Sequence, residues 1–180
     1  MLKILRQISS EVKFSNPFWN YRFDKYSLPN GNEGEYHYVE TRGSVMVVPK
    51  LKDGSFILLR QYRYLNQRLS IEFPGGGILR GKSAEESAEI ELQEESGFKA
   101  GKITQIGQFN PCNGITSEMC SVFFADELEK EKIGHDTSEE FEPVIMTTDE
   151  INRAIQSGDL WDGMTMAAWS LYSFSNLLLI

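Results

Sequence analysis

The most constraining feature of this sequence is a run of glycines that leads directly into a helix. Three consecutive glycines, Gly75 to Gly77, predict a loop, because glycine enters positive φ without strain. Ser83 and Glu86 have the spacing of a capping box, so they mark a helix N-terminus. Nothing breaks a helix over residues 84–96, and Gly97 stands where helices commonly end. The stretch therefore predicts a glycine loop followed by a helix.

Carboxylates gather on one face of this predicted helix. Glu91, Glu94 and Glu95 are three or four residues apart, and this spacing places side chains on a shared face. Like charges at that spacing repel, and a cation between them would remove the repulsion. Mg²⁺ prefers carboxylate and carbonyl oxygens and typically also binds substrate phosphates. The pattern indicates a metal site for phosphate chemistry, with a solvated acidic helix face as the alternative.

The order of residues in this stretch resembles the signature of the Nudix hydrolases, G-x5-E-x7-R-E-U-x-E-E-x-G-U, where U is aliphatic or aromatic. The positions that match in register are Gly76, Glu91, Leu92, Glu94, Glu95, Gly97 and Phe98. Two positions depart from it, since Lys82 replaces the first glutamate and Ile90 replaces the arginine.

The resemblance implies a function for each carboxylate. In the family, the glutamates of the R-E-x-x-E-E segment carry Mg²⁺ and the arginine orients them. Catalytic and metal-binding roles therefore fall on Glu91, Glu94 and Glu95, with the Gly75 carbonyl as a further metal ligand. Mg²⁺ is the expected cofactor and Mn²⁺ is the alternative.

Apolar runs before the glycines predict the start of a buried sheet. Residues 45–48 and 56–59 are continuously apolar, and Asp53-Gly54 between them is a hairpin signal. The order of strands, hairpin and helix suits an α/β/α sandwich with a mixed β-sheet, the fold that the Nudix resemblance also implies. We assign residues 41–180 to this domain and residues 1–40 to an N-terminal β-hairpin extension.

The N-terminal extension carries alternating aromatic and polar residues. Residues 18–27 and 35–40 read as two strands of a hairpin, and a hairpin alone is marginally stable. We expect Phe18, Trp19 and Tyr21 to form its core rather than a base-stacking platform. The layout resembles the ADP-ribose pyrophosphatase branch of the Nudix family, which implies a homodimer through the N-terminal strands.

The same branch carries an arginine before a strand, an R-Q-Y-R-like segment after the next strand, and a W-E-L-P-A-G-like entry to the signature. This chain has Arg42-Gly43, RQYRY over 60–64 and IEFPGG over 71–76. Arginine is suited to binding phosphate through two hydrogen bonds. For any single arginine here, the alternative is an ordinary exposed residue at the end of a strand. The candidate substrate contacts are Arg42, Arg63, Glu72, Gly76 and Gly77.

Residues 126–142 are highly charged. On charge alone this segment is a surface loop. The resemblance implies that the loop brings a glutamate to the metals as a general base or extra ligand. Of the candidates Glu139, Glu140 and Glu142, we favour Glu139 or Glu140 as the catalytic base.

Composition narrows the class of partner. A net charge of −8 and a pI of about 4.9 argue against a binder of nucleic-acid backbones. Two cysteines with no zinc-type spacing favour a reducing compartment. The N-terminus lacks a signal-peptide pattern, and the apolar C-terminal run is too short to span a membrane. We therefore expect a cytoplasmic protein that acts on a small-molecule nucleotide.

The residues and the resemblance together predict Mg²⁺-dependent hydrolysis of the diphosphate bond in a nucleoside diphosphate linked to another group. ADP-ribose is the favoured substrate, and the products would be AMP and ribose 5-phosphate. Two alternatives stay open. One is a catalytically weak or inactive Nudix-fold module that binds nucleotides, and the other is a nucleotide-sugar pyrophosphatase.

Overall fold

The computed structural model describes residues 4–131 and 140–177 of the 180-residue chain. Its residues divide into two compact units, which we describe one at a time. The first unit contains Met1–Gly43 and Asn110–Met119, and the second contains Ser44–Phe109 and Cys120–Ile180.

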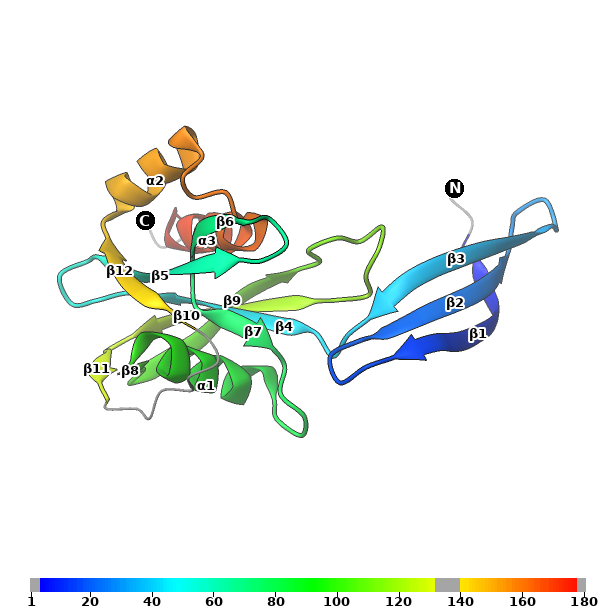
Figure 1. Cartoon of the computed structure of the whole chain (residues 1–180), viewed down its shortest axis with the longest axis horizontal. Coiled ribbons are helices and arrows are strands. Elements are labelled where there is room, and N and C mark those ends of the chain that lie inside the picture. The colour runs from blue at the N-terminus through cyan, green and yellow to red at the C-terminus, as the bar shows by residue number, and fades with distance from the viewer. Residues whose placement is uncertain (1–3, 132–139, 178–180) are drawn as a thin grey trace. The chain divides into compact units, whose positions relative to one another are not determined.

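The first unit is built on an antiparallel sheet in the order β1-β2-β3 (Figure 1). These strands are β1 (Arg6–Ser15), β2 (Asn20–Ser27) and β3 (Glu33–Glu40). The expected hairpin is thus present as β2 and β3, and β1 adds a third strand at the edge. The segment Asn110–Met119 contacts β3, where the Tyr36 hydroxyl donates a hydrogen bond of 3.0 Å to the Gly114 carbonyl.

The aromatic residues at the start of β2 do not form a buried core within this unit. Phe18 is 76% exposed, Trp19 is 38% exposed and Tyr21 is 36% exposed. The expectation of a hairpin core for these residues is therefore wrong for the single chain. The physical reason is that the described part of the unit is one sheet with a short segment beside it, so no second layer covers these rings.

The second unit contains a mixed four-stranded sheet in the order β7-β4-β10-β9, in which β4 and β10 are parallel and the other pairs are antiparallel. A second, antiparallel sheet has the order β12-β5-β6, and β8 pairs with β11. The strands are β4 (Ser44–Pro49), β5 (Phe56–Arg63), β6 (Arg68–Glu72), β7 (Gly75–Gly77), β8 (Phe98–Lys99), β9 (Lys102–Phe109), β10 (Cys120–Asp126), β11 (Glu129–Lys130) and β12 (Glu142–Met146). The helices are α1 (Ala84–Ser96), α2 (Thr148–Ser157) and α3 (Gly163–Leu177).

Strand β4 lies at the centre of this unit and is buried along its whole length. Because successive side chains of a strand point to opposite faces, Val45 and Val47 join one core cluster with Leu92 of α1. Val48 joins the other cluster, which includes Trp169 of α3. Figure 1 shows α1 and α3 on opposite sides of the sheet. The α/β/α sandwich with a mixed sheet is therefore confirmed.

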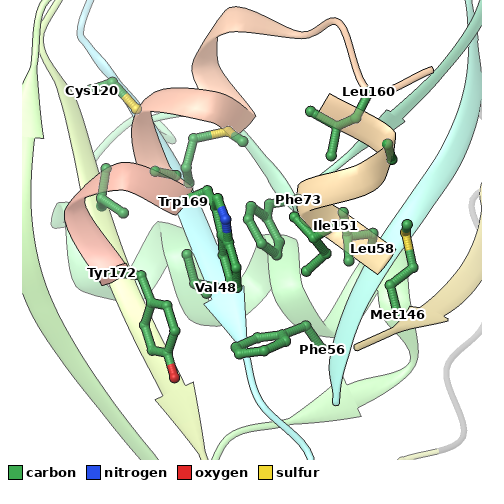
Figure 2. Packing of buried hydrophobic residues seen from close by; sticks show 14 residues of the cluster. Val48, Phe56, Leu58, Phe73, Cys120, Met146, Ile151, Leu160, Trp169 and Tyr172 are labelled. Carbon is green, nitrogen blue, oxygen red and sulfur yellow. The ribbon is translucent and has the colours of Figure 1, made fainter. Parts of the chain in front are cut away.

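Aromatic rings fill the core on the α3 side. Phe56 meets Trp169 edge-on with ring centroids 5.0 Å apart, and it meets Tyr172 in the same way at 5.2 Å. Figure 2 shows Phe73, at the end of β6, packed among these rings. Edge-to-face contacts of this kind add to the stabilisation from burial. This packing anchors α3 and the end of β6 to the same core.

Within the described residues, no helix combines the length and apolar character needed to cross a membrane.

Candidate functional site

The predicted helix after the glycines is confirmed as α1, with the expected ends. The Ser83 hydroxyl accepts a hydrogen bond from the Glu86 backbone N–H at 3.1 Å, and the Glu86 carboxylate accepts one from the Ser83 N–H at 2.8 Å. At the other end, Gly97 adopts φ 74° and donates its N–H to the Gln93 carbonyl. Both ends of α1 are thus fixed by the residues that the sequence singled out.

The three glycines form an edge strand, β7, where the sequence predicted a loop. Gly76 pairs with Val45 of β4 in an antiparallel register. None of the three glycines has a positive φ. Gly75 is required by space instead, because a Cβ there would lie 2.4 Å from the Val45 carbonyl oxygen, whereas a Cβ on Gly77 would meet nothing within 4 Å. The predicted loop is wrong here because a side-chain-free strand can pair with β4 and still leave room for α1.

Two of the three helix carboxylates lie against this glycine strand. A Cβ on Gly76 would lie 2.5 Å from Oε1 of Glu91, so the absence of a side chain makes room for that carboxylate. The Glu95 carboxylate accepts a hydrogen bond from the Gly75 N–H at 2.9 Å. Glu94, in contrast, is exposed. The structure therefore brings Glu91 and Glu95 to β7.

The two carboxylates offer a divalent cation suitable oxygen ligands. Among the described residues, no three His, Cys, Asp or Glu side chains form a group that could hold a metal. Mg²⁺ does not require such a cage, because it is usually held by one or two carboxylates, several waters and substrate phosphates. Glu91 and Glu95, beside the backbone of Gly75, fit that mode of binding.

A buried ion pair lies at the end of β6, just before the glycines. The Arg63 guanidinium donates from Nε to Oε1 of Glu72 at 2.8 Å and from Nη2 to Oε2. Gln61 Nε2 donates to the same Oε2 at 3.3 Å. The Glu72 side chain is only 4% exposed, whereas that of Arg63 is 47% exposed. Glu72 was expected to touch the substrate, and its burial leaves almost no surface for that contact.

The environment of Arg63 keeps it charged. The hydrogen bonds with Glu72 raise the pKa of the guanidinium above its ordinary value, partial burial opposes this, and the charges of Glu72, Asp162 and Glu95 raise the pKa further. The charge of Glu95 is the smallest of these influences on the pKa of Arg63. A permanently charged, half-exposed guanidinium is suited to binding an anionic oxygen.

Arg63 also lines a hollow of about 420 Å³ between the β5–β6 turn and the segment before β12. Tyr62, Tyr64 and Glu140 contribute to the same lining. Glu140, a predicted base, therefore shares this hollow with a predicted substrate contact. Glu139, the other favoured base, lies outside the described residues.

The structure also gives the surroundings of the other predicted residues. Glu142 is in β12, where its carboxylate accepts a hydrogen bond of 2.9 Å from Arg60. Gly77 ends β7 in an exposed position. Arg42 belongs to the first unit, where it lines a hollow of about 180 Å³ together with Trp19 and Glu40.

The two departures from the signature are placed differently. The Lys82 ammonium lies 3.4 Å from Glu86, at the solvent-exposed start of α1. Ile90 is half-buried one residue before Glu91. The lysine therefore interacts with the helix cap, whereas the isoleucine directly precedes Glu91 in the sequence.

Sequence reasoning missed the residues that hold β6 from the side of α3. Thr165 is fully buried, and its hydroxyl oxygen accepts a hydrogen bond of 3.1 Å from the Phe73 N–H. Trp161 donates from Nε1 to the Leu69 carbonyl at 3.0 Å. Both contacts join residues 92 positions apart, so no local pattern could have indicated them.

Comparisons with known proteins agree with this geometry. The NUDIX domain family model matches residues 40–166. The ADP-ribose pyrophosphatase of Bacillus subtilis (strain 168) is 30% identical over 165 residues, which cover 91% of this chain and 89% of that protein. The methanol dehydrogenase activator of Bacillus methanolicus is 26% identical, with the same coverage of 91% and 89%.

A solved structure shows the same fold. The crystal structure of an ADP compounds hydrolase superposes with a TM-score of 0.82 and covers 96% of this chain and 94% of its own, at 22% sequence identity. The match to the family model spans most of the chain and includes β7 and α1. The chain therefore belongs to the Nudix family, as a pyrophosphatase-type hydrolase that resembles the ADP-ribose pyrophosphatases.

Proposed function

We propose that this protein hydrolyses the diphosphate bond of ADP-ribose, with Mg²⁺ as cofactor, to give AMP and ribose 5-phosphate. The observation that carries the proposal is the placement of Glu91 and Glu95 against the glycine strand, in the same compact unit as Arg63. The similarity to the ADP-ribose pyrophosphatase of Bacillus subtilis supports the choice of substrate.

The cation would be held by Glu91 and Glu95, with the Gly75 carbonyl and, as the resemblance implies, Glu94. A bound Mg²⁺ would neutralise the charge that develops on the diphosphate and lower the pKa of an attacking water. Mn²⁺ offers a similar oxygen preference and is the alternative ion.

The remaining residues of the site would orient the diphosphate and accept a proton. Arg63 would donate hydrogen bonds to a diphosphate oxygen, and the backbones of Gly76 and Gly77 allow close approach. Arg42 is a further substrate contact that the family resemblance implies. The water oxygen would bond to phosphorus as the bridging P–O bond breaks and the leaving phosphate departs. Glu140 or Glu139 would take the proton from the water.

The N-terminal residues 1–40 would act as an extension that forms a homodimer, and residues 41–180 as the catalytic domain. The start of the family match at residue 40 supports that boundary. All ten residues of β1 are exposed, and a long unprotected edge strand is a ready site for pairing with another chain. The free cysteines Cys112 and Cys120 suit the reducing cytoplasm.

The test is the release of AMP from ADP-ribose with Mg²⁺ or Mn²⁺, measured for the wild type and for Glu95→Gln. We expect the substitution to reduce kcat/KM by about 100-fold or more, because it removes a metal-binding charge. Glu89→Gln is the matched control, since Glu89 is an exposed residue of the same helix. Release of AMP that needs neither metal nor Glu95 would contradict the proposal.

The same assay separates the alternatives. A nucleotide-sugar pyrophosphatase would leave ADP-ribose intact and cleave a GDP-linked or other nucleotide sugar. A binding module would bind ADP-ribose without releasing AMP from any member of such a panel.

A further inference from the structure

We infer that Glu72 is a positioning residue that acts on the substrate only through Arg63. The inference rests on the proposed function, in which Arg63 binds the diphosphate. It replaces the expectation that Glu72 contacts the substrate directly.

The first argument is that the Glu72 carboxylate is already occupied. Its Oε1 accepts from Arg63 Nε, and its Oε2 accepts from Arg63 Nη2 and Gln61 Nε2. An ionised carboxylate has about four acceptor positions and no donor, so three are taken. With 4% of the side chain exposed, and with a charge of the same sign as a diphosphate, Glu72 is not suited to bind the substrate itself.

The second argument is the orientation of the guanidinium. Arg63 turns Nε and Nη2 towards Glu72, and the described residues provide no hydrogen bond to Nη1. The group is half exposed and lines the 420 Å³ hollow. Because a guanidinium is a rigid plane, fixing its inner edge also fixes the direction of its outer donors. Glu72 thereby aims the donors that an anionic oxygen would meet.

The third argument is that β6 is itself held on both sides of Glu72. Trp161 binds the Leu69 carbonyl, and the Arg68 guanidinium lies 3.9 Å from the centre of the Trp161 ring. Thr165 binds the Phe73 N–H next to Glu72. Trp161, which precedes α3, and Thr165, in the first turn of α3, thus hold β6 and the residue after it. β6 in turn holds Glu72, and Glu72 orients Arg63.

A double-mutant cycle tests this order of action. The variants are Glu72→Gln, Arg63→Lys and the two combined, and the measured quantity is kcat/KM for ADP-ribose. Glu72→Gln keeps the shape of the side chain but removes the charge that fixes the guanidinium. Arg63→Lys keeps the positive charge beside Glu72 but removes the planar fork.

If Glu72 acts through Arg63, each single substitution lowers kcat/KM by about 10-fold to 100-fold, the usual range for loss of a supporting partner. The kcat/KM of the double variant should then lie within about threefold of that of Arg63→Lys, because without the guanidinium Glu72 has no group to orient. If Glu72→Gln costs the same factor in both backgrounds, Glu72 contacts substrate or metal independently and the inference is wrong.

Two controls keep the result interpretable. Arg60→Lys changes an arginine of the same strand that pairs with Glu142 instead, and it should keep wild-type kcat/KM. Thermal unfolding of all variants shows whether each is folded at the assay temperature.

A wild type that binds ADP-ribose but releases no AMP would overturn the proposed function alone. The cycle would then be measured on the dissociation constant for ADP-ribose, where the same non-additivity is expected and simple additivity would overturn the inference.

Discussion

The two ends of helix α1 meet very different surroundings. At its start, Lys82 and Glu86 are exposed and interact with each other and with the cap. About one and a half to two and a half turns after Glu86, Glu91 and Glu95 lie against the glycine strand, so closely that one glycine has no room for a Cβ and another donates its N–H. One end of the helix stabilises the helix, and the other end forms the site.

One of the two departures from the signature lies at the exposed end of α1. The substitution of lysine for the first glutamate falls at the solvent end, where it adds an ion pair to the cap. The glutamates that face β7 match the signature. Ile90 replaces the arginine that orients the glutamates in the family, and in this structure the Gly75 N–H provides Glu95 with a hydrogen-bond donor. We therefore expect changes at residues that contact β7 to have larger effects on activity than changes at the exposed start of α1.

The largest effect is expected at the packed end, from Gly76→Ala. The added Cβ would lie 2.5 Å from Oε1 of Glu91, so the flexible carboxylate would have to move from its place beside β7. We expect kcat/KM for ADP-ribose to fall by about 10-fold to 100-fold, as for other losses of metal-site support. Titration of Mn²⁺ by calorimetry should show weaker binding.

The matched control is Gly163→Ala, because a Cβ on Gly163 meets nothing within 4 Å and its φ is not positive. It tests for an unspecific effect of adding a methyl group. If Gly76→Ala retained both wild-type activity and wild-type Mn²⁺ affinity, the close contact between β7 and Glu91 would have no functional importance.

A smaller effect is expected at the exposed end of α1, where protonation of the Glu86 carboxylate should lower the stability of the protein. The Ser83 backbone N–H, followed by its hydroxyl and by Lys82, holds the pKa of Glu86 below its ordinary value of 4.5. Because the folded pKa is the lower one, this contribution to stability is complete above pH 4.5 and is lost as the pH falls through the folded pKa. The glutamine in Glu86→Gln can accept the same hydrogen bond but does not titrate.

The free energy of unfolding of the wild type should therefore fall more steeply in this acidic window than that of Glu86→Gln. Urea denaturation of both proteins at a series of pH values measures the difference. Parallel curves would show that the cap does not respond to the charge of Glu86.

Local sequence patterns predicted α1 well, because its ends depend on residues close in sequence. The capping box needs only Ser83 and Glu86, and the C-terminal turn needs only Gly97. The same local reasoning failed for β7. Whether three glycines form a loop or a strand depends on pairing with β4, which the glycines themselves do not encode.

The support of the site could not be predicted for a related reason. Thr165 bonds to Phe73, just after β6, and Trp161 bonds to Leu69 of β6, each 92 positions earlier in the chain. Family resemblance pointed to Glu72 and Arg63, but only the folded chain shows that one is buried and that the other is half exposed. Burial decides which member of such a pair can meet a ligand, and burial is a property of the packed molecule.

The smallest effect is expected from Lys82→Glu, which restores the first glutamate of the signature. The Lys82 side chain is 45% exposed, and its recorded ion pair is with Glu86 on the cap. The change should leave kcat/KM within a factor of about two, the range usual for surface substitutions. It should lower the melting temperature slightly, since two carboxylates four residues apart would repel at the helix start. A tenfold or greater rise in kcat/KM, which we do not expect, would show that this position reaches the metal site and that the two ends of α1 are not functionally separate.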